Sequence, residues 1–241
     1  MFTPQGPTLR ELAVQALSST EHGYDLLAPK FDQTPFRTSD RLLDAVTDAL
    51  RPLGPFRAGL DVCCGTGAGA RVLRQVCEEQ VTGVDFSAGM LARARAAHPD
   101  APGGPRQRWV RADARALPFR GAFDLAVSFG AFGHFLPRER PALFHEVYAA
   151  LRPGGLFAFP VPAPPPVGSR PYVALWGFDL AMRVRNLLWR PRFIMYYRTF
   201  RLPDVLRDLT GAGFTTGLTA LPALGTRADG TPRCRLVIAR R

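Results

Sequence analysis

Hydrophobic residues recur along this chain with two different periods, which predict strands and helices in turn. From about residue 40 onward, short apolar runs of strand length alternate with segments in which apolar residues recur every three or four positions. This alternation is typical of βαβ units and predicts an α/β fold around a mostly parallel sheet. The expected strands are 59–64, 81–86, 107–111, 123–129, 156–159, 215–221 and 235–239. The expected helices are 40–50, a segment from the first glycine turn through Glu79, 90–97, 140–151, 174–190 and one from Pro203 to Gly211.

The regular pattern breaks after the fifth strand. Five prolines between positions 160 and 166 cannot continue a helix or a central strand, so an inserted lid is predicted over about 160–201. The helix within this lid is basic and amphipathic. One face carries Asp179, Arg183, Asn186 and Arg190, and the other carries Trp176, Leu180, Val184, Leu187 and Leu188.

Length and composition fit one domain with a lid. The chain has 241 residues, of which 46% are hydrophobic and 21% charged, and this excludes the collagenous, coiled-coil and disordered classes. The longest uncharged run, 153–169, is too short and too rich in proline to span a bilayer. The N-terminus lacks the pattern of a secretory signal, so a cytoplasmic location is expected. We expect residues 1–39 to form an N-terminal helical cap segment and residues 40–241 the main domain.

The positive charge of the chain is regional. The formal net charge is +11, and 30 of the 31 basic residues are arginine. Residues 160–241 hold 13 Arg and four Asp, which accounts for +9 of this charge, whereas residues 1–159 are nearly balanced. Such a region indicates an anionic substrate, a membrane surface or nucleic acid as partner. The four cysteines have neither the spacing of a zinc site nor that of a disulfide framework, so no metal is expected.

A glycine turn is the strongest local signal for chemistry. An apolar strand ends in Asp61-Val-Cys-Cys-Gly65-Thr66-Gly67-Ala-Gly69 and runs into a helix. Glycine allows a tight turn there and lets backbone N–H groups at the helix N-terminus approach a ligand closely. The spacing also satisfies the dinucleotide fingerprint, so the turn by itself does not choose between NAD and S-adenosylmethionine.

Acidic residues follow the next two strands. Asp85 ends the second strand, where a carboxylate can accept hydrogen bonds from both hydroxyls of a ribose. Asp113 follows the third strand, and NAD-binding domains rarely carry an acid in this loop. A Leu151-Arg-Pro-Gly-Gly155 turn leads into the fifth strand. This set of residues favours S-adenosylmethionine over NAD.

Together these motifs resemble those of class I S-adenosylmethionine-dependent methyltransferases, over about residues 42–240. Four blocks carry the resemblance: Asp-x-x-x-Gly-x-Gly, Gly-Val-Asp-x-Ser-x-x-Met-Leu from Gly83 to Leu91, Asp-Ala-x-x-Leu-Pro-Phe, and Leu-Arg-Pro-Gly-Gly. Four independent blocks in the right order argue against a chance match. The resemblance implies a Rossmann-like seven-stranded sheet, mostly parallel with one antiparallel strand and with helices on both faces. A weaker similarity connects the chain with ubiquinone/menaquinone-type C-methyltransferases and the broad methyltransferase-11 group.

The resemblance also implies roles for individual residues. Gly65, Thr66 and Gly67 are implied to line the methionine part of S-adenosylmethionine, and Asp85 is implied to hold its ribose. The residues implied to surround the adenine are Phe86, Met90, Asp113 and Ala114. Ser128, with Phe129, is implied to floor the pocket near the sulfonium, and Tyr24 is implied to close over the cofactor. Asp61 is expected to fix the glycine turn and not to contact ligand.

Methyl transfer from a sulfonium is an in-line displacement, for which an enzyme mainly aligns the reacting atoms. A general base is optional, and His134 is the histidine nearest the tip of the fourth strand. The aromatic residues of the lid, among them Trp176, Tyr196 and Tyr197, have three readings: they line an acceptor pocket, lie on a membrane surface or form the core of the lid. The expected acceptor is a small, apolar or aromatic molecule.

Two other functions stay open on the sequence. An NAD-dependent oxidoreductase would share the glycine turn but would not explain Asp113. A nucleic-acid methyltransferase or binding module would explain the basic, aromatic lid. However, Ser-Phe-Gly-Ala stands where many base-methylating relatives carry an Asn/Asp-Pro-Pro-Tyr block. Nucleic acid is therefore not an expected partner, whereas peripheral membrane contact through the basic lid is.

Overall fold

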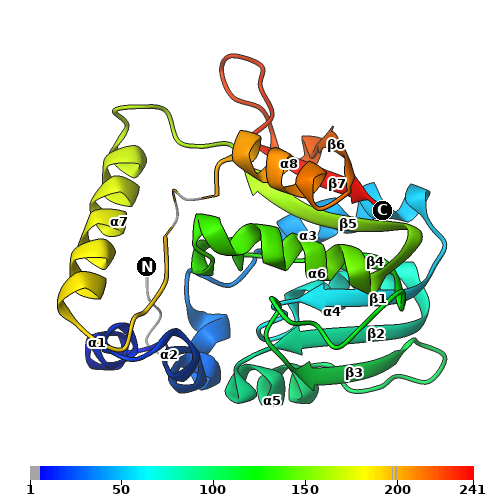
Figure 1. Cartoon of the computed structure of the whole chain (residues 1–241), viewed down its shortest axis with the longest axis horizontal. Coiled ribbons are helices and arrows are strands. Elements are labelled where there is room, and N and C mark those ends of the chain that lie inside the picture. The colour runs from blue at the N-terminus through cyan, green and yellow to red at the C-terminus, as the bar shows by residue number, and fades with distance from the viewer. Residues whose placement is uncertain (1–5, 197, 199) are drawn as a thin grey trace.

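One sheet organises the molecule. The structure is a computed structural model that describes residues 6–196, 198 and 200–241. Within them, seven strands form a sheet in the order β3-β2-β1-β4-β5-β7-β6 (Figure 1). The strands are β1 (Phe56–Val62), β2 (Cys77–Asp85), β3 (Arg106–Arg111), β4 (Phe123–Val127), β5 (Leu151–Pro162), β6 (Thr215–Ala220) and β7 (Cys234–Arg240). The first five pair in parallel, and β7 runs antiparallel to both β5 and β6. The predicted α/β class and the single antiparallel strand are confirmed.

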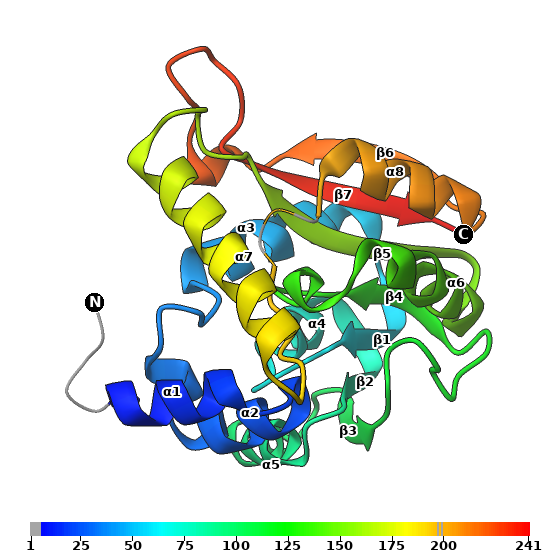
Figure 2. The same cartoon turned by 60° about the vertical axis from the view of Figure 1, so that its left-hand side comes forward.

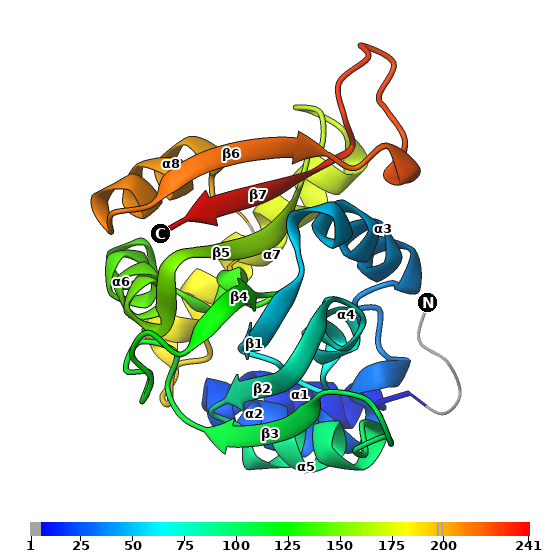
Figure 3. The ribbon, with the colours of Figure 1, turned by 90° about the vertical axis from the view of Figure 1, so that its right-hand side faces the viewer.

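Helices cover both faces of this sheet (Figure 3). The helices α3 (Asp40–Leu50) and α4 (Ala68–Val76) pack on one face, and α6 (Arg140–Ala150) and α8 (Leu202–Gly211) pack on the other. Alternate residues of a strand point to opposite faces. In β5, Phe157 and Phe159 therefore join the core beneath α6, whereas Leu156 and Ala158 join the core beneath α3. The helix α5 (Ala88–Ala97) packs near β2 and β3.

The predicted helix through Glu79 is too long. The helix α4 ends at Val76, and β2 begins at Cys77, opposite Phe56 of β1. Cys77 and Phe56 are both buried, so this first pair of the ladder closes the end of the core. The backbone of 77–80 therefore gains strand partners that a further helical turn would lack.

The strand β5 is longer than predicted at both ends. Phe123 pairs with Leu151 and Leu125 with Leu156, so the predicted Leu-Arg-Pro-Gly-Gly turn is a bulge within the strand. Pro160 and Pro162 continue the strand instead of ending it. The partner β4 stops opposite Ala158, and the N–H of Ala163 donates to Arg233 on the β7 side. In this part of β5 the backbone nitrogens of Pro160 and Pro162 point away from β7, toward the side on which β4 has already ended. A proline at these two positions therefore removes no hydrogen bond between strands.

The segment between β5 and α8 stands outside the two helical layers (Figures 1 and 2). It contains α7 (Arg170–Leu188), which Ser169 caps by accepting a hydrogen bond from the N–H of Tyr172. The polar residues Asp179 and Asn186 of α7 are buried, whereas its apolar residues Trp176 and Leu187 are exposed. Among the described residues, no helix combines the length and the apolar composition that crossing a membrane requires.

The chain that returns after α7 explains this inverted burial. The side-chain amide of Asn186 donates to the carbonyl of Phe193 and accepts from its N–H, and Asp179 accepts from the N–H of Arg198. The described residues of this returning segment have no sheet partner, so the helix supplies hydrogen bonds that their backbone needs. The polar face of α7 is therefore its inner face. One of the three interpretations of the lid aromatics was that they form the core of the lid. Trp176 does not, because it lies on the exposed outer face.

Candidate active site

The glycine turn after β1 forms one wall of a cavity of about 680 Å³. Gly65 and Gly67 have φ values of 52° and 98°, in the region that favours glycine. A Cβ on Gly65 would meet no protein atom within 4 Å, whereas one on Gly67 would collide with the ring of His98. The turn thus leaves space open at Gly65 and is closely packed at Gly67.

Asp61 fixes this turn from below. Its side chain is buried, and its Oδ2 accepts a hydrogen bond of 2.8 Å from the N–H of Ala70. Burial raises the pKa of Asp61 to about 8. Gly69 is required beside it, because a Cβ there would lie 2.5 Å from the Asp61 Cγ. Asp61 does not line the cavity, as expected for a residue that holds the turn.

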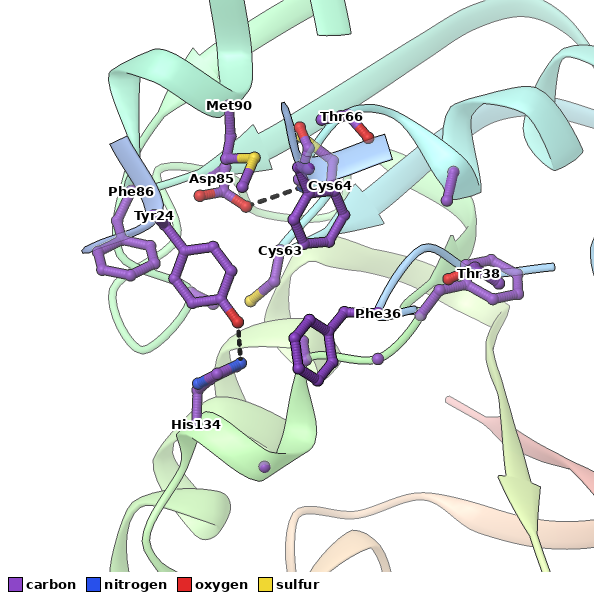
Figure 4. A pocket seen from close by; sticks show the side chains of 18 of the residues that line it. Tyr24, Phe36, Thr38, Cys63, Cys64, Thr66, Asp85, Phe86, Met90 and His134 are labelled. Carbon is purple, nitrogen blue, oxygen red and sulfur yellow. Dashed lines mark hydrogen bonds between the residues drawn. The ribbon is translucent and has the colours of Figure 1, made fainter. Parts of the chain in front are cut away.

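Asp85 connects the glycine turn with the start of α5. Its Oδ2 accepts from the N–H of Gly65 at 2.9 Å, and its Oδ1 accepts from the N–H of Ser87 at 2.9 Å. The side chain is buried at the cavity wall, and burial raises its pKa above the ordinary value. Figure 4 shows Asp85 beside Phe86 and Met90, which also line the cavity. The structure therefore brings these three predicted residues together.

Asp113 and Ala114 line the same cavity, beyond the end of β3. Asp113 forms an ion pair of 2.7 Å with Arg115, which holds the pKa of the Asp113 carboxyl below its ordinary value. Arg115 also pairs with Glu139 at 2.5 Å. A ligand amine at Asp113 would therefore share the carboxylate with an arginine.

Ser128 does not floor the cavity, so this prediction is corrected. Its hydroxyl is buried and donates to the carbonyl of Val62 at 2.8 Å, joining β4 to β1. The next residue, Phe129, does line the cavity. Both residues follow the end of β4, where Ser128 turns back toward β1 and Phe129 faces the cavity.

The N-terminal helices close the cavity from the side opposite the strand ends. The cap segment folds as α1 (Leu9–Leu17), α2 (Thr20–Leu27) and the short η1 (Ala28–Gln33). Tyr24 and Asp32 line the cavity, and Asp32 accepts a hydrogen bond of 2.7 Å from the hydroxyl of Thr66. Asp25 accepts from the Ser87 hydroxyl and the Gly89 N–H, which joins α2 to α5.

His134 and Tyr24 meet inside the cavity (Figure 4). The Nδ1 of His134 lies 2.7 Å from the carbonyl oxygen of Ile194, which can only accept, so Nδ1 carries the proton. Burial lowers the pKa of His134, so the ring is neutral near pH 7. Its Nε2 therefore accepts from the Tyr24 hydroxyl, 2.7 Å away. The pair has one defined tautomer, with a basic nitrogen directed at a phenol.

The remaining wall of the cavity is largely apolar. It is built by Phe36, Phe129, Phe135, Ile194, Met195, Tyr196 and Phe200. Of the predicted acceptor residues, Tyr196 lies here and is buried. Trp176 does not line the cavity, because it lies on the outer face of α7 with 47% of its surface exposed. Tyr197 lies outside the described residues.

Several lining residues carried no sequence signal for the site. Phe36 and His98 belong to this group. Phe36 stands in a loop without periodicity, and His98 follows α5 at some distance along the chain from the glycine turn that it touches. Among the described residues, no three His, Cys, Asp or Glu side chains are grouped as a metal site would require.

Residues 60–155 match a protein-family model described as a methyltransferase domain. This segment, which holds the glycine turn, Asp85 and Asp113, is similar to methyltransferase domains. The methyltransferase resemblance of the sequence motifs is thereby confirmed, and the match decides against an NAD-binding reading of the glycine turn.

Similar proteins agree with this domain. A trans-aconitate 2-methyltransferase of Deinococcus radiodurans is 37% identical over 116 residues, covering 48% of this chain and 42% of that protein. A demethylmenaquinone methyltransferase of Beutenbergia cavernae is 32% identical over 164 residues, covering 65% of this chain and 62% of that protein. The chain thus spans about half the length of the curated relatives it matches. The crystal structure of an S-adenosylmethionine dependent methyltransferase from Mesorhizobium loti superposes with a TM-score of 0.55 at 28% identity, covering 83% of this chain and 100% of that one.

Proposed function

We propose that this protein transfers a methyl group from S-adenosylmethionine to a small, apolar or aromatic acceptor by in-line displacement. One observation carries the proposal: a single cavity joins the glycine turn and Asp85 to the apolar wall that contains Phe129 and Tyr196. Its volume, about 680 Å³, lies in the range of small-molecule sites. S-adenosylmethionine, when bound, supplies a methyl group on a sulfonium that is already a good leaving group. The protein then has to exclude water and align the acceptor.

The residues of the cofactor half fit such a ligand. Gly65 and Gly130 line the cavity, and a Cβ on either would meet no protein atom within 4 Å, so a side chain there would occupy cavity space. Gly65, Thr66 and Gly67 would hold the methionine part, and Asp85 would accept from the ribose hydroxyls. The adenine would lie among Phe86, Met90, Asp113 and Ala114, with Tyr24 closing over the cofactor.

The charges of the cavity favour a neutral acceptor. Three arginines line it, Arg37, Arg71 and Arg115, and each forms an ion pair with a carboxylate of the protein. A tricarboxylate such as the substrate named for the Deinococcus radiodurans relative would have to displace these partners. A neutral ring, as in the menaquinone precursor named for the Beutenbergia cavernae relative, fits the aromatic wall without that cost.

His134 is proposed as the general base for an acceptor that must lose a proton. An acceptor hydroxyl placed beside Tyr24 would donate to the phenol oxygen, while the phenol donates to Nε2 of His134. The proton would then pass to a neutral imidazole whose Nδ1–H stays bound to Ile194.

Titration calorimetry with S-adenosylhomocysteine tests the cofactor site. Asp85→Asn should weaken binding by about ten- to a hundredfold, since a charged acceptor of two hydroxyl hydrogen bonds is lost. Asp204→Asn, on α8 away from the cavity, is the matched control and should bind as wild type does. Unchanged binding by Asp85→Asn would remove the ribose role, and binding of NADH without S-adenosylhomocysteine would favour an oxidoreductase.

A further inference from the structure

The outer face of α7 carries a continuous apolar stripe in contact with water. Val173, Trp176, Leu180, Val184 and Leu187 follow one another at spacings of three and four, which places them on one helix face. Leu188 is the last residue of the helix and the exposed Trp189 follows it, and these seven residues are called the α7 stripe below. Their exposed fractions range from 47% for Trp176 to 80% for Leu187. Scattered exposed apolar residues are ordinary, but a contiguous stripe of this kind marks an interaction surface.

The α7 stripe is surrounded by positive charge. Residues 163–203 contain seven arginines and one acid, Asp179, whose side chain is buried on the inner face of the helix. Arg170, Arg190 and Arg192 are exposed. None of the ion pairs formed within the described part of the chain includes these three arginines. The surface therefore combines aliphatic and indole side chains with unneutralised guanidinium groups.

We propose that the α7 stripe docks on an anionic membrane surface. The helix would lie in the plane of the interface, with Leu187, Leu188 and Trp189 among the acyl chains and the arginines at the phosphate groups. Burial of apolar area and attraction of basic residues to acidic headgroups are the two contributions that such peripheral binding requires. Both are present on this helix, and the inference does not depend on the proposed methyl transfer.

Charge and side-chain type also separate this partner from two others. A second copy of the chain, related by a twofold axis through the stripe, would bring arginines against arginines with no exposed carboxylate from 163 to 203 to oppose them. Single-stranded nucleic acid binds to basic grooves in which aromatic rings stack on successive bases. The centre of this face is instead formed by the aliphatic side chains of Leu180, Val184 and Leu187, on which bases do not stack.

The position of α7 gives the docking a consequence for the cavity. Met182 on the inner face packs with Phe193, Met195 and Tyr196. Met195 and Tyr196 in turn line the cavity. The helix and the side chains on its inner face therefore separate the proposed membrane surface from the apolar wall of the site. Figure 2 shows α7 in front of the rest of the molecule.

Tryptophan fluorescence offers a direct test. The protein has three tryptophans, of which Trp176 and Trp189 belong to the α7 stripe and Trp109 lies in β3. In Trp109→Phe, emission reports the stripe alone. We expect it to shift to shorter wavelength with vesicles of equal parts phosphatidylcholine and phosphatidylglycerol, and the protein to sediment with them, whereas vesicles of phosphatidylcholine alone should bind far less.

Paired variants separate the two contributions. Leu187→Ser with Leu188→Ser should lower partitioning by at least about tenfold, and Leu218→Ser, at an exposed leucine of β6, is its control. Arg190→Gln with Arg192→Gln should lower it by about tenfold or more on anionic vesicles. The control, Arg93→Gln with Arg95→Gln, changes two exposed arginines of α5. Circular dichroism and thermal unfolding confirm that each variant is folded.

Three results would overturn the proposal. The first is wild-type protein that ignores anionic vesicles. The second is a dimer in light scattering that Leu187→Ser with Leu188→Ser dissociates, without vesicle binding. The third is salt-sensitive binding to a nucleic-acid oligomer together with no binding to vesicles.

Discussion

At the scale of single residues, glycines and buried ionisable groups determine the geometry of the site. Gly69 makes room for the Asp61 carboxyl group, and that carboxyl group holds the N-terminus of α4. His134 holds one tautomer because a carbonyl oxygen faces its Nδ1. In each case a small group or a single proton determines how a longer segment lies.

Replacement of Gly69 by alanine should destabilise the protein. The new Cβ would collide with the buried carboxyl group of Asp61, so Gly69→Ala should lower the free energy of unfolding by about 2 kcal/mol or more in urea denaturation. Gly177→Ala is the control, because a Cβ on this helical glycine of α7 meets nothing within 4 Å. It should raise stability by about 0.5–1 kcal/mol. Equal stability of the two variants would contradict the close packing at Asp61.

The lowered pKa of His134 predicts a loss of stability in acid. The unfolded chain binds a proton at this ring near its ordinary pKa of 6.5, whereas the folded protein binds it only at lower pH. The full contribution of the neutral ring is therefore present above pH 6.5 and is lost as the pH falls toward the folded pKa, with a slope of at most about 1.4 kcal/mol per pH unit.

Urea unfolding of wild type and His134→Gln at a series of pH values measures this slope. His98, whose pKa burial also lowers, is present in both proteins, so the difference between their slopes belongs to His134. Parallel stability curves for the two proteins would show that the ring titrates as it does in the unfolded chain.

At the scale of elements, the sequence was sufficient to predict most of the sheet and which strand-end residues meet at the cavity. Short buried strands with glycine turns and acids at their ends predicted β1 to β4 and brought Gly65, Asp85 and Asp113 together, because parallel strands end at one edge. The extent of β5 was not predictable, since it depends on where β4 stops. The orientation of α7 depends on a backbone segment that returns beside it. The pairing of Tyr24 with His134 was not predictable either, since the two residues are 110 positions apart in sequence.

Asn186 should be the residue that holds α7 to the rest of the molecule. Its side-chain amide donates to the carbonyl of Phe193 and accepts from the N–H of the same residue. It also donates to the Tyr196 hydroxyl at 2.9 Å. Asn186→Ala should cost about 2 kcal/mol or more of unfolding free energy and should speed proteolysis between α7 and α8. Leu187→Ala, at the exposed neighbour, should change stability by less than about 0.5 kcal/mol. Unaltered proteolysis in Asn186→Ala would show that other contacts hold this segment.

At the scale of the whole molecule, the cavity is formed by parts of the chain that are distant in sequence. The strand ends, the N-terminal helices and the segment after α7 each contribute a wall. Hydrogen bonds from Thr66 to Asp32, from Tyr24 to His134 and from the N–H of Ile194 to the hydroxyl of Thr20 join these walls. A ligand that fills the cavity should therefore stabilise all three parts together.

Thermal unfolding with S-adenosylhomocysteine measures this stabilisation. At a concentration a hundredfold above Kd, binding adds about 2.7 kcal/mol, which corresponds to a rise in Tm of about 5–10 °C for a domain of this size. Asp85→Asn should show a much smaller rise at the same concentration. A wild-type Tm that does not respond would contradict the proposed cofactor site.

The α7 stripe also affects how the protein behaves in concentrated solution. Salts such as ammonium sulfate strengthen the association of apolar surfaces and screen the arginines that otherwise keep molecules apart. We expect the protein to precipitate at low concentrations of such salts and to be retained on hydrophobic-interaction resins. Leu187→Ser with Leu188→Ser should then improve solubility and leave the cavity as it is, since neither leucine lines it.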